Sequence, residues 1–383
     1  MRSKNLTADG APELEQHLAL ICAKIAAGIR GLVPRQKLEA VLLGGGYGRG
    51  EGGVLETPAG PRPYNDLEFY VCLRGQRHLN ELRFGRALHV LGEILTPQAG
   101  VEVEFKITSL RELAAAPVSM FSYDLVVGHR WLIGREEQLA ACAHHRDPAQ
   151  IPLNEATRLL MNRCSGLLFA QERLEKREFT AGDADFVRRN IAKADLALGD
   201  AVLVAFGHYH WSVRERHRQM ERLARGEPLP WLPAVRLRHA AGVEFKLHPE
   251  RSTASRETLH AQHHAVAQLA KEVWLWVESR RLGRPIQSIR DYVELDQSKY
   301  DGASALRNLA INLRALGPWG VFSRRGLRHP RERILNAMPL LLWQPEALRS
   351  ADGLPFLQGE LQTTATTFAE LMQAYRALWS LVN

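Results

Sequence analysis

The chain of 383 residues has little cysteine and no paired cysteine motif. Its four cysteines are far apart in the sequence, and they are Cys22, Cys72, Cys142 and Cys164. Because none forms a CxxC pair, the common zinc-ribbon patterns are excluded and no disulfide framework is indicated. A reducing compartment is the expected environment for such a chain, so we expect a cytoplasmic protein.

Long apolar runs are also missing. No stretch of about 18 uncharged apolar residues occurs, so the sequence predicts no membrane span. Residues 1–10 lack the apolar segment of a signal peptide, and none is expected. The overall content of 45% hydrophobic and 24% charged residues is ordinary for a soluble globular protein.

Acidic residues are outnumbered by basic ones. The 50 basic and 42 acidic residues give a formal net charge of +8, which favours anionic partners such as nucleotides or RNA. A solvated basic surface explains the same excess. The densest basic segment, 324–333, has only Phe322 as a nearby aromatic residue, so base stacking has little support. RNA therefore stays open as a partner but is not favoured.

The first part of the chain alternates between helix and strand patterns. Apolar residues three to four positions apart predict helices over 12–30 and 79–95. Apolar runs and period-two alternation predict strands at 41–43, 67–73 and 101–107. Residues 51–64 are rich in Gly and Pro, which indicates a loop. We therefore predict a mixed α/β domain over residues 1–148.

The remainder of the chain is predominantly helical in pattern. Long Leu-, Ala- and Arg-rich segments predict helices at 154–178, 183–209, 256–281, 302–316 and 365–382. The only clear strand signal is at 242–247. These patterns predict an α-helical domain over 149–383, with a further division near 285–300. The predicted fold class of the whole chain is α+β.

The most informative segment is a glycine-rich turn at 44–50 that follows a short apolar strand. Asp66 and Glu68 lie at the next strand, and because residues i and i+2 point to the same side, they share a face. Two neighbouring carboxylates repel unless a cation lies between them. Carboxylate oxygens together with substrate phosphates suit Mg²⁺. Glu102 and Glu104, on the strand predicted at 101–107, are the candidates for a third carboxylate.

This order of elements resembles the signature of the DNA polymerase β-like nucleotidyltransferase superfamily, in its minimal form. Gly45 and Gly46 match the Gly-Ser or Gly-Gly turn, and Arg49 matches the Arg-Gly of the minimal members. Asp66 and Glu68 match the two metal-binding acids. The resemblance implies a small mixed sheet that binds an NTP with Mg²⁺ or Mn²⁺. It also implies a helical C-terminal domain that supplies the acceptor site.

The resemblance implies a role for each matching residue. Asp66 and Glu68 would bind both metal ions, and Glu104, preferred to Glu102, would bind the catalytic metal and help to deprotonate the acceptor. Gly45, Gly46 and Arg49 would hold the phosphates. An ion pair with Glu51 is the alternative for Arg49. Lys193, on the helix predicted at 183–209, would reach the triphosphate, and an ordinary solvated helix face is the alternative.

Two positions depart from the signature. Gly46 replaces the usual Ser, which removes a hydroxyl that can bind the triphosphate, and Glu68 replaces Asp, which shifts the metal-binding oxygens by a methylene. The predicted function is transfer of an NMP from an NTP to a hydroxyl-type acceptor, which is a small molecule, RNA or a protein. The alternative is a non-catalytic protein on the same fold that binds a nucleotide or docks a protein partner.

Histidine-rich segments at 208–211 and 260–264 do not match the HExxH spacing of zinc enzymes. The chain contains 15 histidines, so chance clusters are expected. We do not predict a metal site at either segment.

Overall fold

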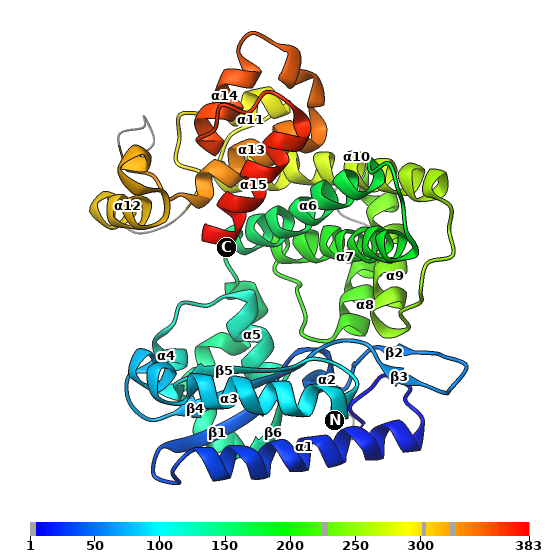
Figure 1. Ribbon diagram of the computed structural model, residues 1–383, viewed down its shortest axis with the longest axis vertical. Coiled ribbons are helices and arrows are strands. Elements are labelled where there is room, and N and C mark those ends of the chain that lie inside the picture. The colour runs from blue at the N-terminus through cyan, green and yellow to red at the C-terminus, as the bar shows by residue number, and fades with distance from the viewer. Residues whose placement is uncertain (1–4, 224–228, 301–303, 322–325, 383) are drawn as a thin grey trace. The chain divides into compact units, whose positions relative to one another are not determined.

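A computed structural model describes residues 5–223, 229–300, 304–321 and 326–382 of the chain (Figure 1). The chain divides into two compact units. Unit 1 comprises residues 1–152, 206–227 and 240–251, and unit 2 comprises 153–205, 228–239 and 252–383. Two segments of the sequence after residue 149 thus belong to unit 1. Arg324 and Arg325 of the basic segment lie outside the described residues.

Unit 1 contains a small sheet and the helices that cover it. Its elements up to residue 152 are α1 (Pro12–Leu32), β1 (Leu38–Leu43), α2 (Gly45–Arg49), β2 (Val54–Leu55), β3 (Arg62–Pro63), β4 (Leu67–Leu73), α3 (Arg77–Ala99), β5 (Val103–Thr108), α4 (Leu110–Ala115), α5 (Met120–Val127), β6 (Arg130–Ile133) and two 3₁₀ segments, Glu136–Arg146 and Pro148–Gln150. Its later segments hold α8 (Val213–Arg222) and the end of α9 (Leu232–Leu247). The strands predicted at 41–43, 67–73 and 101–107 and the helices predicted at 12–30 and 79–95 are confirmed.

The main sheet has four strands in the order β5-β4-β1-β6. β4 and β5 are parallel, whereas β1 is antiparallel to both β4 and β6. The parallel pair is connected through α3, as a parallel pair requires a crossover rather than a hairpin. The mixed α+β class that the sequence predicts is therefore confirmed.

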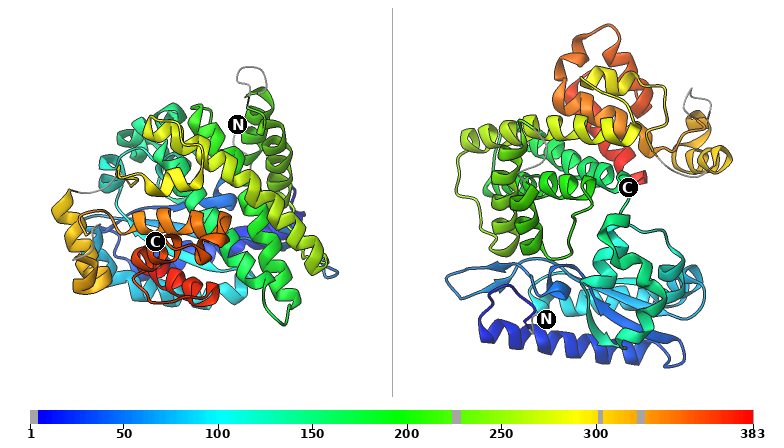
Figure 2. Two further views of the ribbon diagram at one scale, coloured as in Figure 1. Left: turned by 90° about the horizontal axis from the view of Figure 1, so that it is seen from above. Right: turned by 180° about the vertical axis from the view of Figure 1, so that it is seen from behind.

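One face of the sheet packs against α1 and α3, which lie side by side over it (Figure 2). The buried strand residues on this face include Val41, Leu43, Leu67 and Phe69. From α1 it receives Leu18, Ile21, Ile25 and Ile29, which repeat at helical spacing. Leu67 and Phe69 of β4 therefore point to the core, on the side opposite to Glu68.

The opposite face packs against α4, α5 and the longer 3₁₀ segment. Its buried cluster includes Leu42, Tyr70 and Cys72 from the strands and Leu125 from α5. Because side chains alternate along a strand, Glu68 is on this same face, two residues before Tyr70. The candidate acidic residues therefore lie on the face opposite to α1 and α3.

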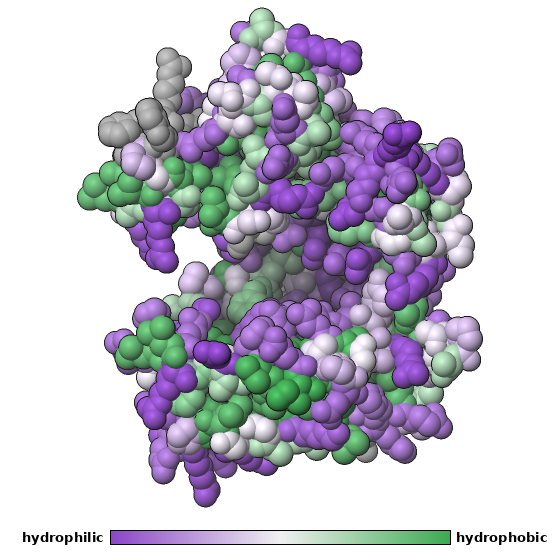
Figure 3. Space-filling view, in the orientation of Figure 1, coloured by the Kyte–Doolittle hydropathy of each residue, from purple (hydrophilic) through white to green (hydrophobic). Residues whose placement is uncertain are grey.

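The outer side of α3 carries apolar side chains as well as charged ones. Leu79, Leu82, Val90 and Ile94 are 42–72% exposed, and apolar surface over α3 is visible among hydrophilic side chains in Figure 3. Single exposed apolar side chains are common on folded proteins and need no partner to explain them.

Three local predictions are wrong in detail. The glycine-rich turn at 44–50 is a short helix, α2, and the loop at 51–64 contains the paired strands β2 and β3. The strand predicted at 242–247 is instead the last part of α9. The buried residues Val235, His239, Val243 and Leu247 are four positions apart, so the helical period of the longer segment prevails over six alternating residues.

Unit 2 is built from helices in its described part. They are α6 (Asn154–Leu174), α7 (Ala181–Ala205), the first half of α9, α10 (Arg256–Leu282), α11 (Ile289–Glu294), α12 (Ala305–Val321), α13 (Arg331–Trp343), a 3₁₀ segment (Pro345–Arg349), α14 (Gly353–Leu361) and α15 (Phe368–Val382). The helices predicted after residue 150 are confirmed. In the described parts of the chain, no helix has both the length and the apolar character needed to cross a membrane.

Candidate metal centre

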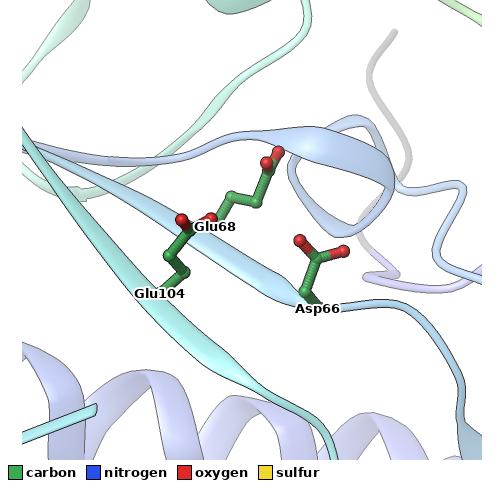
Figure 4. A group of neighbouring side chains, drawn as sticks. All are labelled: Asp66, Glu68 and Glu104. Atoms are coloured by element: carbon green, nitrogen blue, oxygen red, sulfur yellow. The ribbon is translucent and has the colours of Figure 1, made fainter. Parts of the chain in front are cut away.

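Three carboxylates from two neighbouring strands come together on one face of unit 1 (Figure 4). Glu68 of β4 lies opposite Glu104 of β5 in the parallel register, and Asp66 directly precedes β4. One oxygen atom from each of the three lies within 4.8 Å of the other two. Glu102, the other candidate, precedes β5 and has an exposed side chain, while its backbone oxygen accepts a hydrogen bond from Leu67 N.

The donor set fits a hard divalent cation. Asp66 is exposed, and the side chains of Glu68 and Glu104 are 25% and 43% exposed, so solvent and ligands have access to all three. Two oxygens bound to one Mg²⁺ lie at most about 4.2 Å apart, twice the usual Mg–O distance. Oxygens already within 4.8 Å therefore need only small side-chain rotations to share one ion. Mg²⁺ and Mn²⁺ both suit carboxylate oxygens.

The glycine-rich segment reaches the acidic residues through close backbone contact. Gly44 N donates a hydrogen bond to the backbone oxygen of Glu68 at 2.9 Å. Gly45 follows with a φ of +60°, and a Cβ added there would lie 2.9 Å from Oε2 of Glu68. Glycine is therefore required at position 45 both by its backbone conformation and by the carboxylate beside it.

Gly46 has an explanation in the local packing. A Cβ at this buried position would lie 3.1 Å from the backbone oxygen of Glu51 and 3.4 Å from Cα of Gly52. The chain that follows α2 folds back against Gly46, and Glu51 N donates to the Gly46 oxygen at 2.8 Å. A Ser Cβ at Gly46 would thus be in tight contact with the returning backbone, which would have to shift by a few tenths of an ångström.

Lys106 is a further charged residue at the acidic group. Its Nζ lies 3.1 Å from Oε1 of Glu68 and 3.0 Å from Oε2 of Glu104. The same Nζ lies 5.8 Å from the ring centroid of Tyr70. Burial alone would lower the pKa of this ammonium, but Tyr70 and the two glutamates outweigh burial and raise the pKa above its usual value. Lys106 therefore remains charged in the folded protein at neutral pH.

Arg49 is held inside the protein by acidic partners. Its side chain is 9% exposed, and Nη1 lies 3.1 Å from Oδ2 of Asp124 on α5. Its Nε lies 4.0 Å from Glu51, so the ion pair with Glu51 that the sequence offered as an alternative is present but is the longer of the two. Tyr209 donates from its hydroxyl to the same Asp124 oxygen at 3.2 Å. A phosphate contact by Arg49 stays a prediction.

Glu51 connects the glycine-rich segment to α8. Its buried carboxylate accepts hydrogen bonds from Oγ of Ser212 at 2.5 Å and from Val213 N at 2.8 Å. These donors belong to the N-terminal end of α8, where backbone N–H groups lack partners within the helix and a negative charge is favourable. No local pattern predicts this contact, because the two segments are about 160 residues apart in the sequence.

Lys193 lies in the middle of α7 in unit 2 and has an exposed side chain. It is therefore not among the residues that unit 1 itself brings to the acidic group. Its predicted contact with a triphosphate stays a prediction.

The histidine-rich segments serve other purposes. Nδ1 of His210 accepts a hydrogen bond from Ser212 N, and Nε2 of His263 lies 2.8 Å from the backbone oxygen of Leu167. Among the residues that the structure describes, the group of three or more His, Cys, Asp or Glu side chains able to hold a metal is the acidic one.

The sequence did not single out Lys106, Asp124 or Tyr209 as residues of the site. The signal for Lys106 was available, because it follows Glu104 by two residues on a strand and so shares its face. The chain matches no family model, no curated protein and no solved structure. Its function must therefore be argued from its own residues and their geometry.

Proposed function

We propose that the chain is a metal-dependent nucleotidyltransferase that moves an NMP from an NTP to a hydroxyl-type acceptor. Unit 1 would be a domain of the DNA polymerase β-like type, and the helical unit would contribute to the acceptor site. A small molecule, RNA or a protein remains the acceptor class, with RNA not favoured.

One observation carries the proposal. The elements follow one another in the order of the superfamily signature: β1, the short glycine helix α2, β4 with Asp66 and Glu68 at its start, and the parallel strand β5 with Glu104. The three carboxylates converge at one place. A chance group of surface acids has no reason to coincide with a glycine at which an added Cβ would lie against one of the acids. Gly45 and Glu68 have this relation.

The residues would divide the work of the transfer. Asp66, Glu68 and Glu104 would hold Mg²⁺ or Mn²⁺, which when bound offsets phosphate charge and makes the acceptor hydroxyl more acidic. Glu104 would accept the proton of that hydroxyl. The acceptor oxygen then forms a bond to the α-phosphorus of the NTP, the bond from that phosphorus to the bridging oxygen breaks, and pyrophosphate leaves. Gly45 and Gly46 would allow the phosphates to approach the backbone.

A second function is favoured by one specific observation. Lys106 already neutralises part of the charge of Glu68 and Glu104. If this ion pair is permanent, the protein would bind a nucleotide or a protein partner without catalysing transfer. The transferase function requires that a divalent ion binds between Asp66, Glu68 and Glu104, whereas the non-catalytic function does not.

The test is the melting temperature of the purified full chain with each common NTP, with and without Mg²⁺ or Mn²⁺. A ligand that binds only the folded state raises the melting temperature by mass action. We expect the NTP to raise the melting temperature beyond the increase caused by the metal alone, only when the metal is present, and we expect this effect to be lost in Asp66→Asn. Release of pyrophosphate with a mixture of hydroxyl acceptors should be lost in the same variant.

Two results would contradict the proposal. Pyrophosphate release that is unchanged in Asp66→Asn would place any activity elsewhere. A thermal shift with NTP that needs no metal would favour the non-catalytic alternative.

A further inference from the structure

The ammonium of Lys106 lies where a cation between Glu68 and Glu104 would be expected. It is within 3.1 Å of an oxygen of each glutamate, and those two residues are direct partners across β4 and β5. The ion pairs therefore use the same two carboxylates that the proposed metal site needs. Two ion-pair contacts and the nearby ring of Tyr70 favour this position of the ammonium.

We propose that Lys106 is the resident counter-cation of the acidic group and that a divalent ion binds by displacing its ammonium. This inference rests on the proposed function for the identity of the site, but its test needs no turnover. The group carries three carboxylates. With the ammonium of Lys106 in place, the net negative charge that attracts a divalent ion is smaller by one. Two of the three carboxylates, those of Glu68 and Glu104, are also already paired with Lys106.

The side chain of Lys106 has room to move away from the two glutamates. It is 40% exposed and attached by a flexible four-carbon chain at an outer strand of the sheet, since β5 is the last strand in the order β5-β4-β1-β6. Departure of the ammonium would leave Glu68 and Glu104 facing each other with like charges, a state that a divalent ion relieves. The same residue would thus keep the group stable before metal arrives and set how tightly the metal binds.

The experiment measures Mn²⁺ affinity of the full chain by calorimetry in the absence of nucleotide. In Lys106→Met the competing charge is gone, so we expect Mn²⁺ to bind at least about tenfold more tightly than to the wild type, which corresponds to about 1.4 kcal/mol. The melting temperature without metal should fall in this variant, and the increase caused by Mn²⁺ should be larger.

Two further variants keep the result interpretable. Lys106→Arg retains the charge and adds a planar group that binds carboxylates in a bidentate manner, so its Mn²⁺ affinity should equal or fall below that of the wild type. Arg77→Met removes one charge from another exposed ion pair in unit 1, the 2.7 Å pair of Arg77 with Glu81, and should leave Mn²⁺ affinity within about twofold.

Each outcome decides the inference. Equal Mn²⁺ affinity in Lys106→Met and the wild type would overturn it while leaving the proposed function standing. Weaker NTP binding in Lys106→Met with unchanged Mn²⁺ affinity would also overturn it, because Lys106 would then be a phosphate ligand. Absence of Mn²⁺ binding at millimolar concentrations in both proteins would overturn the inference and the metal site together. Tighter Mn²⁺ binding without any NTP turnover in the wild type would support the inference and contradict the proposed function.

Discussion

Replacement of Gly45 by alanine tests whether the glycine helix and the acidic group form one site. Gly45 has a φ of +60°, and its added Cβ would lie 2.9 Å from Oε2 of Glu68. The substitution therefore has two separate effects. The left-handed conformation costs an L-residue about 1–2 kcal/mol, partly offset by a stiffer unfolded chain. The new methyl group also forces the Glu68 carboxylate away from its present position.

Gly283→Ala is the matched control for the backbone effect. Gly283 ends α10 with a φ of +67°, and a Cβ there would have no atom within 4 Å. Both variants should lose about 1 kcal/mol of unfolding free energy. Only Gly45→Ala should also weaken Mn²⁺ binding, by about 10–100-fold, the usual cost of disturbing the support of a metal ligand.

The assays are urea unfolding for stability and calorimetric titration with Mn²⁺ for affinity. Gly45→Ala and Gly283→Ala should have similar free energies of unfolding in urea and clearly different Mn²⁺ affinities. If Gly45→Ala and Gly283→Ala both keep the Mn²⁺ affinity of the wild type, Glu68 is not a ligand in its present position. The reasoning that connects Gly45 to the site would then be refuted.

Three further predictions concern single carboxylates. Glu104→Gln should weaken Mn²⁺ binding at least about tenfold in a calorimetric titration, because a metal ligand is lost. Glu102→Gln should change the Mn²⁺ affinity less than about twofold. If Glu102→Gln has the larger effect, Glu102 is the third acid. Glu51→Gln should lower the free energy of unfolding in urea by about 2 kcal/mol, because charged hydrogen bonds to the start of α8 are weakened, and an unchanged midpoint would contradict this. Burial raises the pKa of Asp195 to about 7. Between about pH 4 and 7 the Asp195 carboxyl therefore keeps its proton in the folded state and loses it in the unfolded state. The free energy of unfolding should fall as the pH rises through this range. In Asp195→Asn this loss should be smaller by at least about 1 kcal/mol in urea unfolding at both pH values, and an identical pH profile would contradict the assignment.

Much of the fold follows from regular apolar spacing. The residues that α1 buries repeat every three to four positions along the helix, and the interior residues of β4 form an uninterrupted apolar run. Each of these patterns is typical of one type of secondary structure, so the presence of these helices and strands could be predicted. The alternation at 242–247 was too short to outweigh the helical spacing of the longer segment around it.

The site could be predicted only in part, because its parts depend on contacts of different range. Asp66 and Glu68 share a face by the geometry of a single strand, and so do Glu104 and Lys106. That Glu68 lies opposite Glu104 depends on the register of two strands separated by α3, which local patterns do not specify.

The contacts of Arg49 and Glu51 around α2 could not be predicted from the sequence. The contact of Arg49 with Asp124 spans 75 residues, and the residues between them include β4 and β5 of the main sheet. The Glu51 contact to α8 spans about twice that distance in sequence. A charged residue in a glycine-rich turn looks free for a ligand in the sequence, because its distant partners leave no local trace.

The most direct measurement is anomalous X-ray diffraction from crystals soaked with Mn²⁺ and a non-hydrolysable NTP analogue. The account predicts a manganese peak bounded by the carboxylates of Asp66, Glu68 and Glu104, with the ammonium of Lys106 moved away from both glutamates. A peak elsewhere, or an acidic group that keeps Lys106 in place with no manganese beside it, would contradict the central claim.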